Sequence, residues 1–260
     1  METRIKTFKS QSFNRFAPFI VLAFIALTYS FTAKLGMIDD QYFVKIFTGV
    51  NHSLLEFIKL RFETWSSRIF IESLVVFFVN QHLLWKIINS ITLFGTGIAL
   101  LKLIGKPDDY LKWMVVLLIS LYPYTDMASA GWIATTLNYS WPLFFGMIAL
   151  LPIRIYYDEL TIRPVLYPVY ILFTLFAANV EQMAGILFLI FTVAILIDIS
   201  RKRVKSLLVI QYLVIILNLI LIFISPGNYV RRIAEIGTWF PEYAGLRSEE
   251  HTSELQSLSH

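Results

Sequence analysis

The chain has 260 residues, of which 57% are hydrophobic and only 15% are charged, and its mean hydropathy is +0.66. A soluble domain usually carries about a quarter charged residues, so this composition indicates a multi-pass membrane protein. The net charge of +4 is patterned along the chain and is no sign of nucleic-acid binding, and the absence of cysteine excludes disulfides and thiolate metal sites.

The N-terminus is a short basic stretch ahead of an apolar run. Its positive residues are Arg4, Lys6, Lys9 and Arg15. A signal peptide is the alternative, but the small-x-small cleavage pattern is missing, since Phe31 stands two positions before Ala33. We therefore predict a cytoplasmic segment 1–15 followed by an uncleaved membrane helix.

Long apolar runs predict an all-α fold, a polytopic transmembrane helix bundle over residues 16–246. A run of about 20 residues crosses a bilayer, and somewhat fewer suffice when flanking residues snorkel. The run 69–84 is interrupted by Asn80, Gln81 and His82, and is expected to be a re-entrant or interfacial helix. The seven predicted crossings are 16–36, 85–104, 112–124 with its continuation, 140–157, 164–179, 183–199 and 206–225.

Lysine and arginine orient these helices, because cytoplasmic loops are enriched in them. The densest basic cluster is Arg201, Lys202, Arg203 and Lys205, and the pairs Arg154–Arg163 and Lys102–Lys112 bracket two more inside loops. The N-terminus is then cytoplasmic. Four segments are predicted to face outside, namely 37–68, 125–139, 179–182 and 226 onward.

Polar residues concentrate in these outer segments. Asp39 and Asp40 follow the first crossing, and a helical stretch with spaced apolar residues, including Phe43 and Leu55, is expected to lie flat on the bilayer. Each feature also has a structural explanation. The acidic pair fits a helix cap, NYSWP an interface anchor with a proline helix start, SPGN a turn, and Glu72 an ion pair with Arg68 four residues earlier. Taken together, they predict a polar site at the outer membrane interface.

The same segments resemble a known group of bacterial proteins. The Asp-Asp pair after the first membrane helix, the outer loop ending in Arg68, and the stretches NYSWP, NVEQ and SPGNYVRR are similar to a multi-pass family that looks like GT-C glycosyltransferases, including those that glucosylate surface polysaccharides. The resemblance covers about residues 37–232. Ser67 departs from the glycine that the family favours before its arginine.

This resemblance implies an activity at the outer face of the bacterial inner membrane. A sugar would pass from a polyprenyl-phosphate donor to a glycan or lipid acceptor, with Asp39 as the general base and Asp40 as its neighbour or substitute. Arg68, Arg231 and Arg232 would neutralise the departing phosphate. The sugar or acceptor pocket would be formed by Asn138, Tyr139, Trp141, Glu181, Gln182 and Asn228. No cofactor, metal or nucleotide sugar is implied, and no Gly-rich phosphate loop is present.

Three other functions fit the composition. A transporter or flippase for a lipid-linked sugar or small solute would place ionisable residues near the bilayer midplane, where Asp198 and Asn218 are the candidates, and would often have inverted repeats, of which none is visible. A polysaccharide polymerase or ligase would share the outer site. If the protein were a structural membrane subunit, the clustering of polar residues would be a coincidence.

The sequence of the C-terminal segment indicates an origin different from that of the rest of the chain. RSEEHTSELQS, residues 247–257, matches the translation of a common short-read sequencing adapter in order. We expect 247–260 to be an artefact tail on a truncated gene, and the 260-residue chain to be inactive by itself. A genuine polar tail is the alternative. A long read through the codon for Leu246 distinguishes the two.

Overall fold

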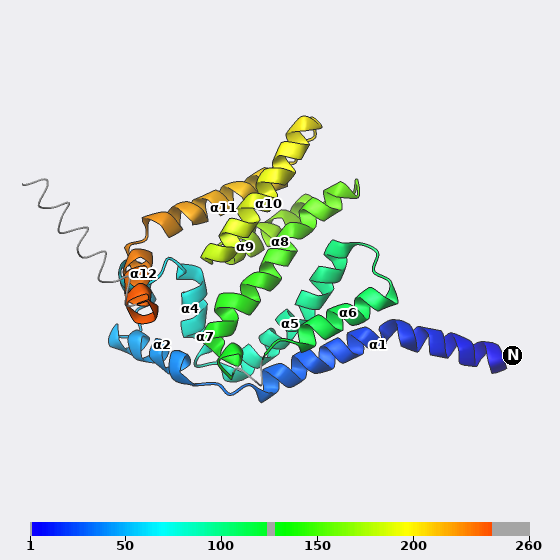
Figure 1. Cartoon of the computed structure of the whole chain (residues 1–260), viewed down its shortest axis with the longest axis horizontal. Coiled ribbons are helices and arrows are strands. Elements are labelled where there is room, and N and C mark those ends of the chain that lie inside the picture. Colours follow the sequence, from blue (N-terminus) through cyan, green and yellow to red (C-terminus); the bar gives the residue numbers. More distant parts are fainter. Residues whose placement is uncertain (1, 124–127, 241–260) are drawn as a thin grey trace, which may run out of the picture.

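The computed structural model describes residues 2–123 and 128–240, and every regular element in those ranges is helical. The all-α prediction is confirmed for this part of the chain, and the predicted artefact tail lies outside it. The helices that Figure 1 labels are α1 Glu2–Thr32, α2 Ile38–Gly49, α4 Ile69–Phe78, α5 His82–Ile104, α6 Asp109–Ser120, α7 Ile133–Thr135, α8 Trp141–Tyr157, α9 Tyr167–Ala177, α10 Glu181–Ser200, α11 Ser206–Ile224 and α12 Pro226–Trp239.

Four of these helical stretches are long and apolar enough to cross a membrane. They are α5, the continuous stretch Ile133–Tyr157, α10 and α11. Shorter apolar helices cover Phe16–Thr32, Ile69–Phe78 and Pro164–Ala177. Large apolar side chains such as Leu189, Leu217 and Phe223 are more than half exposed, as expected of helices that contact lipid. The chain therefore has the composition and helices of a multi-pass membrane protein.

Two predicted boundaries differ from the structure. The predicted crossing 112–124 corresponds to α6, whose 12 residues span about 18 Å at 1.5 Å per residue, less than the bilayer core. The helix predicted to begin at residue 140 begins at Ile133 instead, so the second half of the predicted outer segment 125–139 is helical. A π-helical turn over Thr136–Ser140 precedes Pro142. In an ordinary α-helical turn, the proline ring would clash with the carbonyl group four residues earlier.

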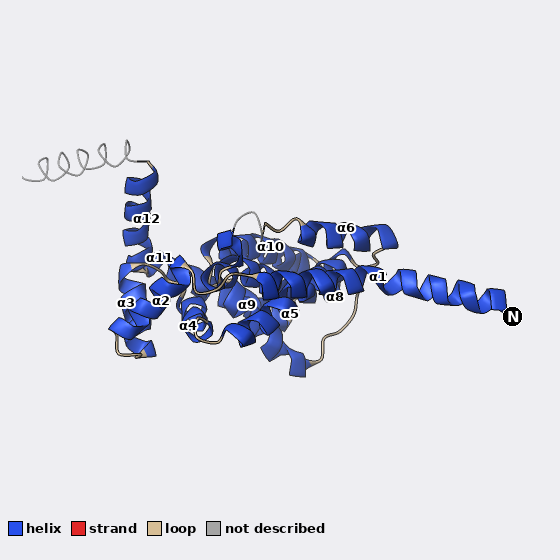
Figure 2. Ribbon diagram, turned by 90° about the horizontal axis from the view of Figure 1, so that it is seen from below, coloured by secondary structure: helices blue, strands red, loops and turns tan. Residues whose placement is uncertain are grey.

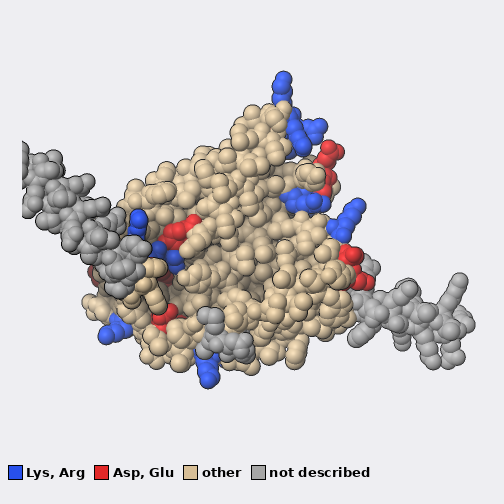
Figure 3. All heavy atoms as spheres, in the orientation of Figure 1, with Lys and Arg blue, Asp and Glu red and all other residues tan. Residues whose placement is uncertain are grey.

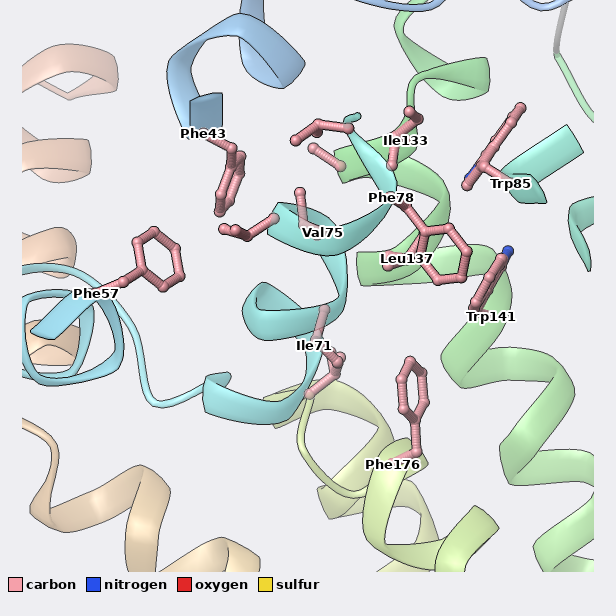
Figure 4. Close-up of a cluster of buried hydrophobic side chains, with 14 residues drawn as sticks. Phe43, Phe57, Ile71, Val75, Phe78, Trp85, Ile133, Leu137, Trp141 and Phe176 are labelled. Atoms are coloured by element: carbon pink, nitrogen blue, oxygen red, sulfur yellow. The ribbon is translucent and has the colours of Figure 1, made fainter. Parts of the chain in front are cut away.

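The short helix α4 lies at the centre of the largest hydrophobic cluster. Its ten residues span about 15 Å, about half the thickness of a bilayer core. Figure 4 shows Ile71 and Val75 of α4 surrounded by side chains from other elements, among them Phe57 of α3 (Leu54–Thr64), Ile133, Trp141 and Phe176. Phe43 of α2 is buried in the same cluster, so this side chain packs on protein and not, as the spacing had suggested, on the bilayer. Leu55, by contrast, is 78% exposed.

The last described helix runs across the direction of the long helices. Figure 2 shows α12 roughly perpendicular to α1 and α8, at the end of the molecule where α2, α3 and α4 also lie. Ser225 separates α11 from α12, and Pro226 occupies the first turn of α12, so SPGN starts a helix and is more than a turn. The transverse helix brings Arg231 and Arg232 to the same end of the molecule as Asp39.

Candidate functional site

The turn between α3 and α4, which carries Arg68, is held by the start of α12. The Asn228 side chain donates to Ser67 Oγ at 2.9 Å and accepts from the Ser67 N–H at 3.2 Å. Gly227 packs so closely on the turn that a Cβ at this position would lie 2.4 Å from Trp65 N. Residues more than 150 positions apart in the sequence therefore fix the backbone beside Arg68.

Arg68 and Arg231 share one carboxylate. Arg68 Nε and Nη2 donate to Glu181 Oε2 at 2.9 and 2.7 Å, and Arg231 Nη2 donates to Glu181 Oε1 at 2.5 Å. Arg68 Nη1 also donates to Asn138 Oδ1 at 2.9 Å. Arg231 Nε also lies 3.9 Å from Oε1 of Glu235, a second carboxylate at the same pocket, so the two guanidinium groups face two carboxylates. Each guanidinium keeps N–H groups that these bonds do not use, and those groups are suited to hold an anion.

The cluster borders a pocket of about 590 Å³. Helices α2, α7, α10 and α12, the π-turn and the α3–α4 turn all contribute to its wall. The aromatic side chains of Tyr42, Trp65 and Tyr139 line it, and aromatic rings of this kind are suited to the faces of sugar rings. Of the residues that the sequence nominated, the pocket is lined by Asp39, Arg68, Asn138, Tyr139, Gln182 and Arg231.

The two adjacent aspartates have different environments. Asp39 is exposed at the pocket wall and makes no hydrogen bond or ion pair with a residue that the structure describes. Asp40 is 1% exposed and accepts N–H bonds from Gly36 at 3.2 Å, Ile133 at 3.4 Å and Ala134 at 3.0 Å. Burial raises the pKa of the Asp40 carboxyl, although these backbone donors act in the opposite direction. Asp40 thus caps the helix that begins at Ile133.

This difference predicts opposite outcomes for two matched substitutions. Asp40→Ala leaves buried N–H groups unsatisfied, so it should lower the free energy of unfolding by about 1–3 kcal/mol. Asp39→Ala should change it by less than about 0.5 kcal/mol, because the side chain is exposed and unpaired. Reversible unfolding in mixed detergent micelles measures both. Equal losses from the two variants would contradict the capping role of Asp40.

A buried ion pair that the sequence did not indicate forms part of the pocket wall. Arg61 Nε and Nη2 donate to Glu72 at 2.5 and 3.0 Å, and both side chains are 5% exposed. The alternative pairing of Glu72 with Arg68 is therefore wrong. The guanidinium of Arg61 also lies 5.3 Å from the centre of the Phe43 ring. Arg61 and Glu72 are 11 positions apart, outside the reach of helical side-chain pairing, so only the turn between α3 and α4 brings them together.

Besides Asp40, four nominated residues do not line the pocket. Trp141 is 3% exposed and donates from Nε1 to Asn89 Oδ1 at 2.9 Å, so it belongs to the core. Asn228 holds the α3–α4 turn, as described above. Arg232 is exposed on α12 and lines a separate hollow of about 290 Å³ along that helix. Glu181 stands behind the wall as the shared partner of two arginines.

No family model, curated protein or solved structure matches this chain at a significant level. Within the described residues, no group of three His, Cys, Asp or Glu side chains is arranged as metal ligands would be. The pocket combines a free carboxylate, an arginine pair and aromatic walls, which together can bind a phosphate-bearing ligand and accept a proton from it or from a second substrate.

Proposed function

We propose that the protein acts as a membrane glycosyltransferase, transferring a sugar from a polyprenyl-phosphate donor to a glycan or lipid acceptor. The observation that carries this proposal is the pocket whose wall contains free Asp39 together with Arg68 and Arg231, the two arginines that share Glu181. A base and a phosphate-binding group are the two elements that such a transfer needs from the protein.

In the proposed reaction, Asp39 accepts the proton of an acceptor hydroxyl. The hydroxyl oxygen attacks the anomeric carbon, the bond between that carbon and the phosphate oxygen breaks, and polyprenyl phosphate leaves. Attack from the face opposite the leaving group inverts the anomeric centre. Arg68 and Arg231 neutralise the phosphate through N–H groups not used by Glu181. Arg232 lies on the same helix, where it can meet the lipid phosphate outside the pocket.

Within this proposal, the chain adopts a GT-C-like arrangement with seven crossings and one re-entrant helix in the bacterial inner membrane, and the 12 residues of α6 cover only part of one crossing. The basic loops support a cytoplasmic N-terminus and a pocket at the outer face. Support comes from α4, which is too short to cross, and from α12, which runs transverse to the long helices as a helix at a membrane surface would. The bilayer would supply the lipid-linked donor directly to the pocket.

The polar residues inside the long helices favour an enzyme over a transporter. Asn218 Oδ1 accepts from Asn179 at 3.4 Å, its own amide donates to the Val214 carbonyl at 2.9 Å, and Gln211 donates to Thr174 and to the Ala149 carbonyl. The bond to Val214 lies within α11, whereas the others link α11 to α8, to α9 and to the turn after α9, as buried polar groups in membranes often do. Among these side-chain groups, Gln211 Oε1 alone is buried without a hydrogen-bond partner among the described residues. Asp198 lies near the end of α10 instead of in its middle.

Labelling with a diazirine-bearing polyprenyl phosphate tests where the donor binds. The protein in lipid nanodiscs should be labelled at residues of the 590 Å³ pocket. Thr135→Trp should reduce labelling about tenfold or more, because overfilling the pocket introduces clashes that cost about 1–3 kcal/mol. Thr64→Trp, on the exposed surface of α3 away from the pocket, is the matched control and should label normally.

The labelled positions decide the outcome. Labelling that Thr135→Trp suppresses, and that unlabelled polyprenyl phosphate but not a nucleotide sugar displaces, supports the proposed donor. Labelling spread evenly over the long helices, or unchanged in Thr135→Trp, would show that the pocket is not the donor site and overturn the proposal.

A further inference from the structure

A second pocket lies at the opposite end of the molecule from the candidate site. It has a volume of about 420 Å³ and lies between the end of α8 and the turn that joins α10 to α11. Figure 1 shows these helix ends projecting together, away from α2, α4 and α12, and Figure 3 shows Lys and Arg side chains gathered at the same end. No residue of this pocket takes part in the proposed transfer reaction.

At the rim of this pocket, two α-helices each end in a residue with a left-handed backbone conformation. Glu159 after α8 and Lys202 after α10 have φ values of 60° and 54°. The following N–H groups fold back, from Leu160 to the Ile155 carbonyl at 3.1 Å and from Arg203 to the Asp198 carbonyl at 2.9 Å. These closed turns satisfy the last carbonyls of each helix and hold Arg201 and Arg203 at the pocket.

The charges of the rim are only partly compensated. Arg203 and Glu159 approach to 3.5 Å, but their side chains are 64% and 81% exposed, so this pair is weak. The Arg201 side chain forms no ion pair with a described residue, and Lys205 Nζ lies 5.5 Å from the centre of the Tyr156 ring. Three cations therefore face the two carboxylates of Glu159 and Asp198, which leaves one positive charge in excess. A ligand with one negative charge would balance it.

Two further features of the pocket indicate which ligand it would prefer. Asp198 Oδ2 is buried and has no hydrogen-bond partner among the described residues, so a hydroxyl donor from a ligand would satisfy it. Ile153, Ala194, Ile197 and Leu208 form an apolar side of the same pocket, and Ile197 is 44% exposed on the lipid-facing surface. The pocket thus combines a phosphate-binding rim, a hydroxyl acceptor and a wall for acyl chains.

We propose that this pocket binds an anionic phospholipid whose headgroup carries a free hydroxyl, such as phosphatidylglycerol. The phosphate diester lies against Arg201 and Arg203, a headgroup hydroxyl donates to Asp198 Oδ2, and the acyl chains run along Ile197. The site is independent of the proposed glycosyl transfer, and it would tie the α8 and α10 ends to the lipid leaflet on that side of the membrane.

Native mass spectrometry of the purified full chain with added lipid tests this site. Phosphatidylglycerol should bind more tightly than phosphatidylmethanol, which has the same charge and no headgroup hydroxyl, and than zwitterionic phosphatidylethanolamine. Arg201→Gln and Arg203→Gln should each weaken phosphatidylglycerol binding about tenfold, the effect of losing one charge-assisted hydrogen bond. Lys202→Gln is the matched control, since Lys202 shapes the rim only through its backbone turn and does not line the pocket.

The comparison of lipids on the unaltered protein does not depend on any variant. Equal binding of phosphatidylglycerol and phosphatidylmethanol would remove the role of Asp198, and equal binding of phosphatidylethanolamine would remove the charge preference. Either result overturns the proposal. So does an equal loss in Lys202→Gln, which would indicate diffuse surface charge, and so does equally tight binding of glycerol phosphate, which would indicate a soluble ligand. Asp198→Leu should abolish the preference for phosphatidylglycerol over phosphatidylmethanol.

Discussion

Asp39→Asn is expected to slow sugar transfer about 100- to 10,000-fold, the range typical for loss of a general base. The amide keeps the size of the side chain but cannot accept the hydroxyl proton. Because Asp39 is exposed and bonded to no described residue, the substitution should leave the amount of protein in the membrane unchanged. Transfer of radiolabelled sugar from polyprenyl phosphate should be measured in membranes of cells that carry the variant at the gene's own locus.

Two controls separate catalysis from binding and folding. Glu63→Gln removes an exposed carboxylate from α3, outside the pocket, and should leave the transfer rate as it is. Labelling of Asp39→Asn with the diazirine-bearing polyprenyl phosphate should also persist, since the arginine cluster still holds the phosphate. Normal transfer by Asp39→Asn would exclude Asp39 as the base, while loss of both labelling and transfer would assign it to donor binding.

The second large effect concerns the buried pair of Arg61 and Glu72. Glu72→Leu leaves the Arg61 guanidinium buried without its partner, so the free energy of unfolding should fall by about 3–5 kcal/mol. The double variant Arg61→Met with Glu72→Leu should recover most of this loss, because apolar side chains of similar volume replace both charges. Reversible unfolding in mixed micelles gives the free energies, and the double-mutant cycle gives the coupling between the two residues.

An exposed pair provides the comparison for this experiment. Lys112 and Asp109 approach to 2.7 Å, but the Asp109 side chain is 67% exposed. Asp109→Asn should therefore cost less than about 1 kcal/mol. If Glu72→Leu were equally mild, the Arg61–Glu72 pair would not be a main support of the α3–α4 turn, and the position of Arg68 would have to depend on Gly227 and Asn228 instead.

Hydrophobic runs determined the helical, membrane-type character of the chain without any tertiary information. A run of apolar residues of sufficient length can satisfy its backbone groups in lipid only as a helix, so α5, α10 and α11 follow directly from composition. The clustering of polar residues in the segments predicted to face outside likewise pointed to Asp39, Arg68 and Arg231, which the structure brings to one pocket. Local sequence thus identified part of the candidate site, but not the Arg61–Glu72 pair in its wall.

Only the tertiary structure decided how neighbouring residues divide their roles. Asp39 and Asp40 look alike in the sequence, but successive residues of a helix point about 100° apart, so one faces the pocket and the other caps a helix more than 90 residues away. That distant cap also starts the helix at Ile133, earlier than the local pattern indicated. The partner of Glu72 and the burial of Trp141 depend likewise on contacts between separate elements, which no local spacing encodes.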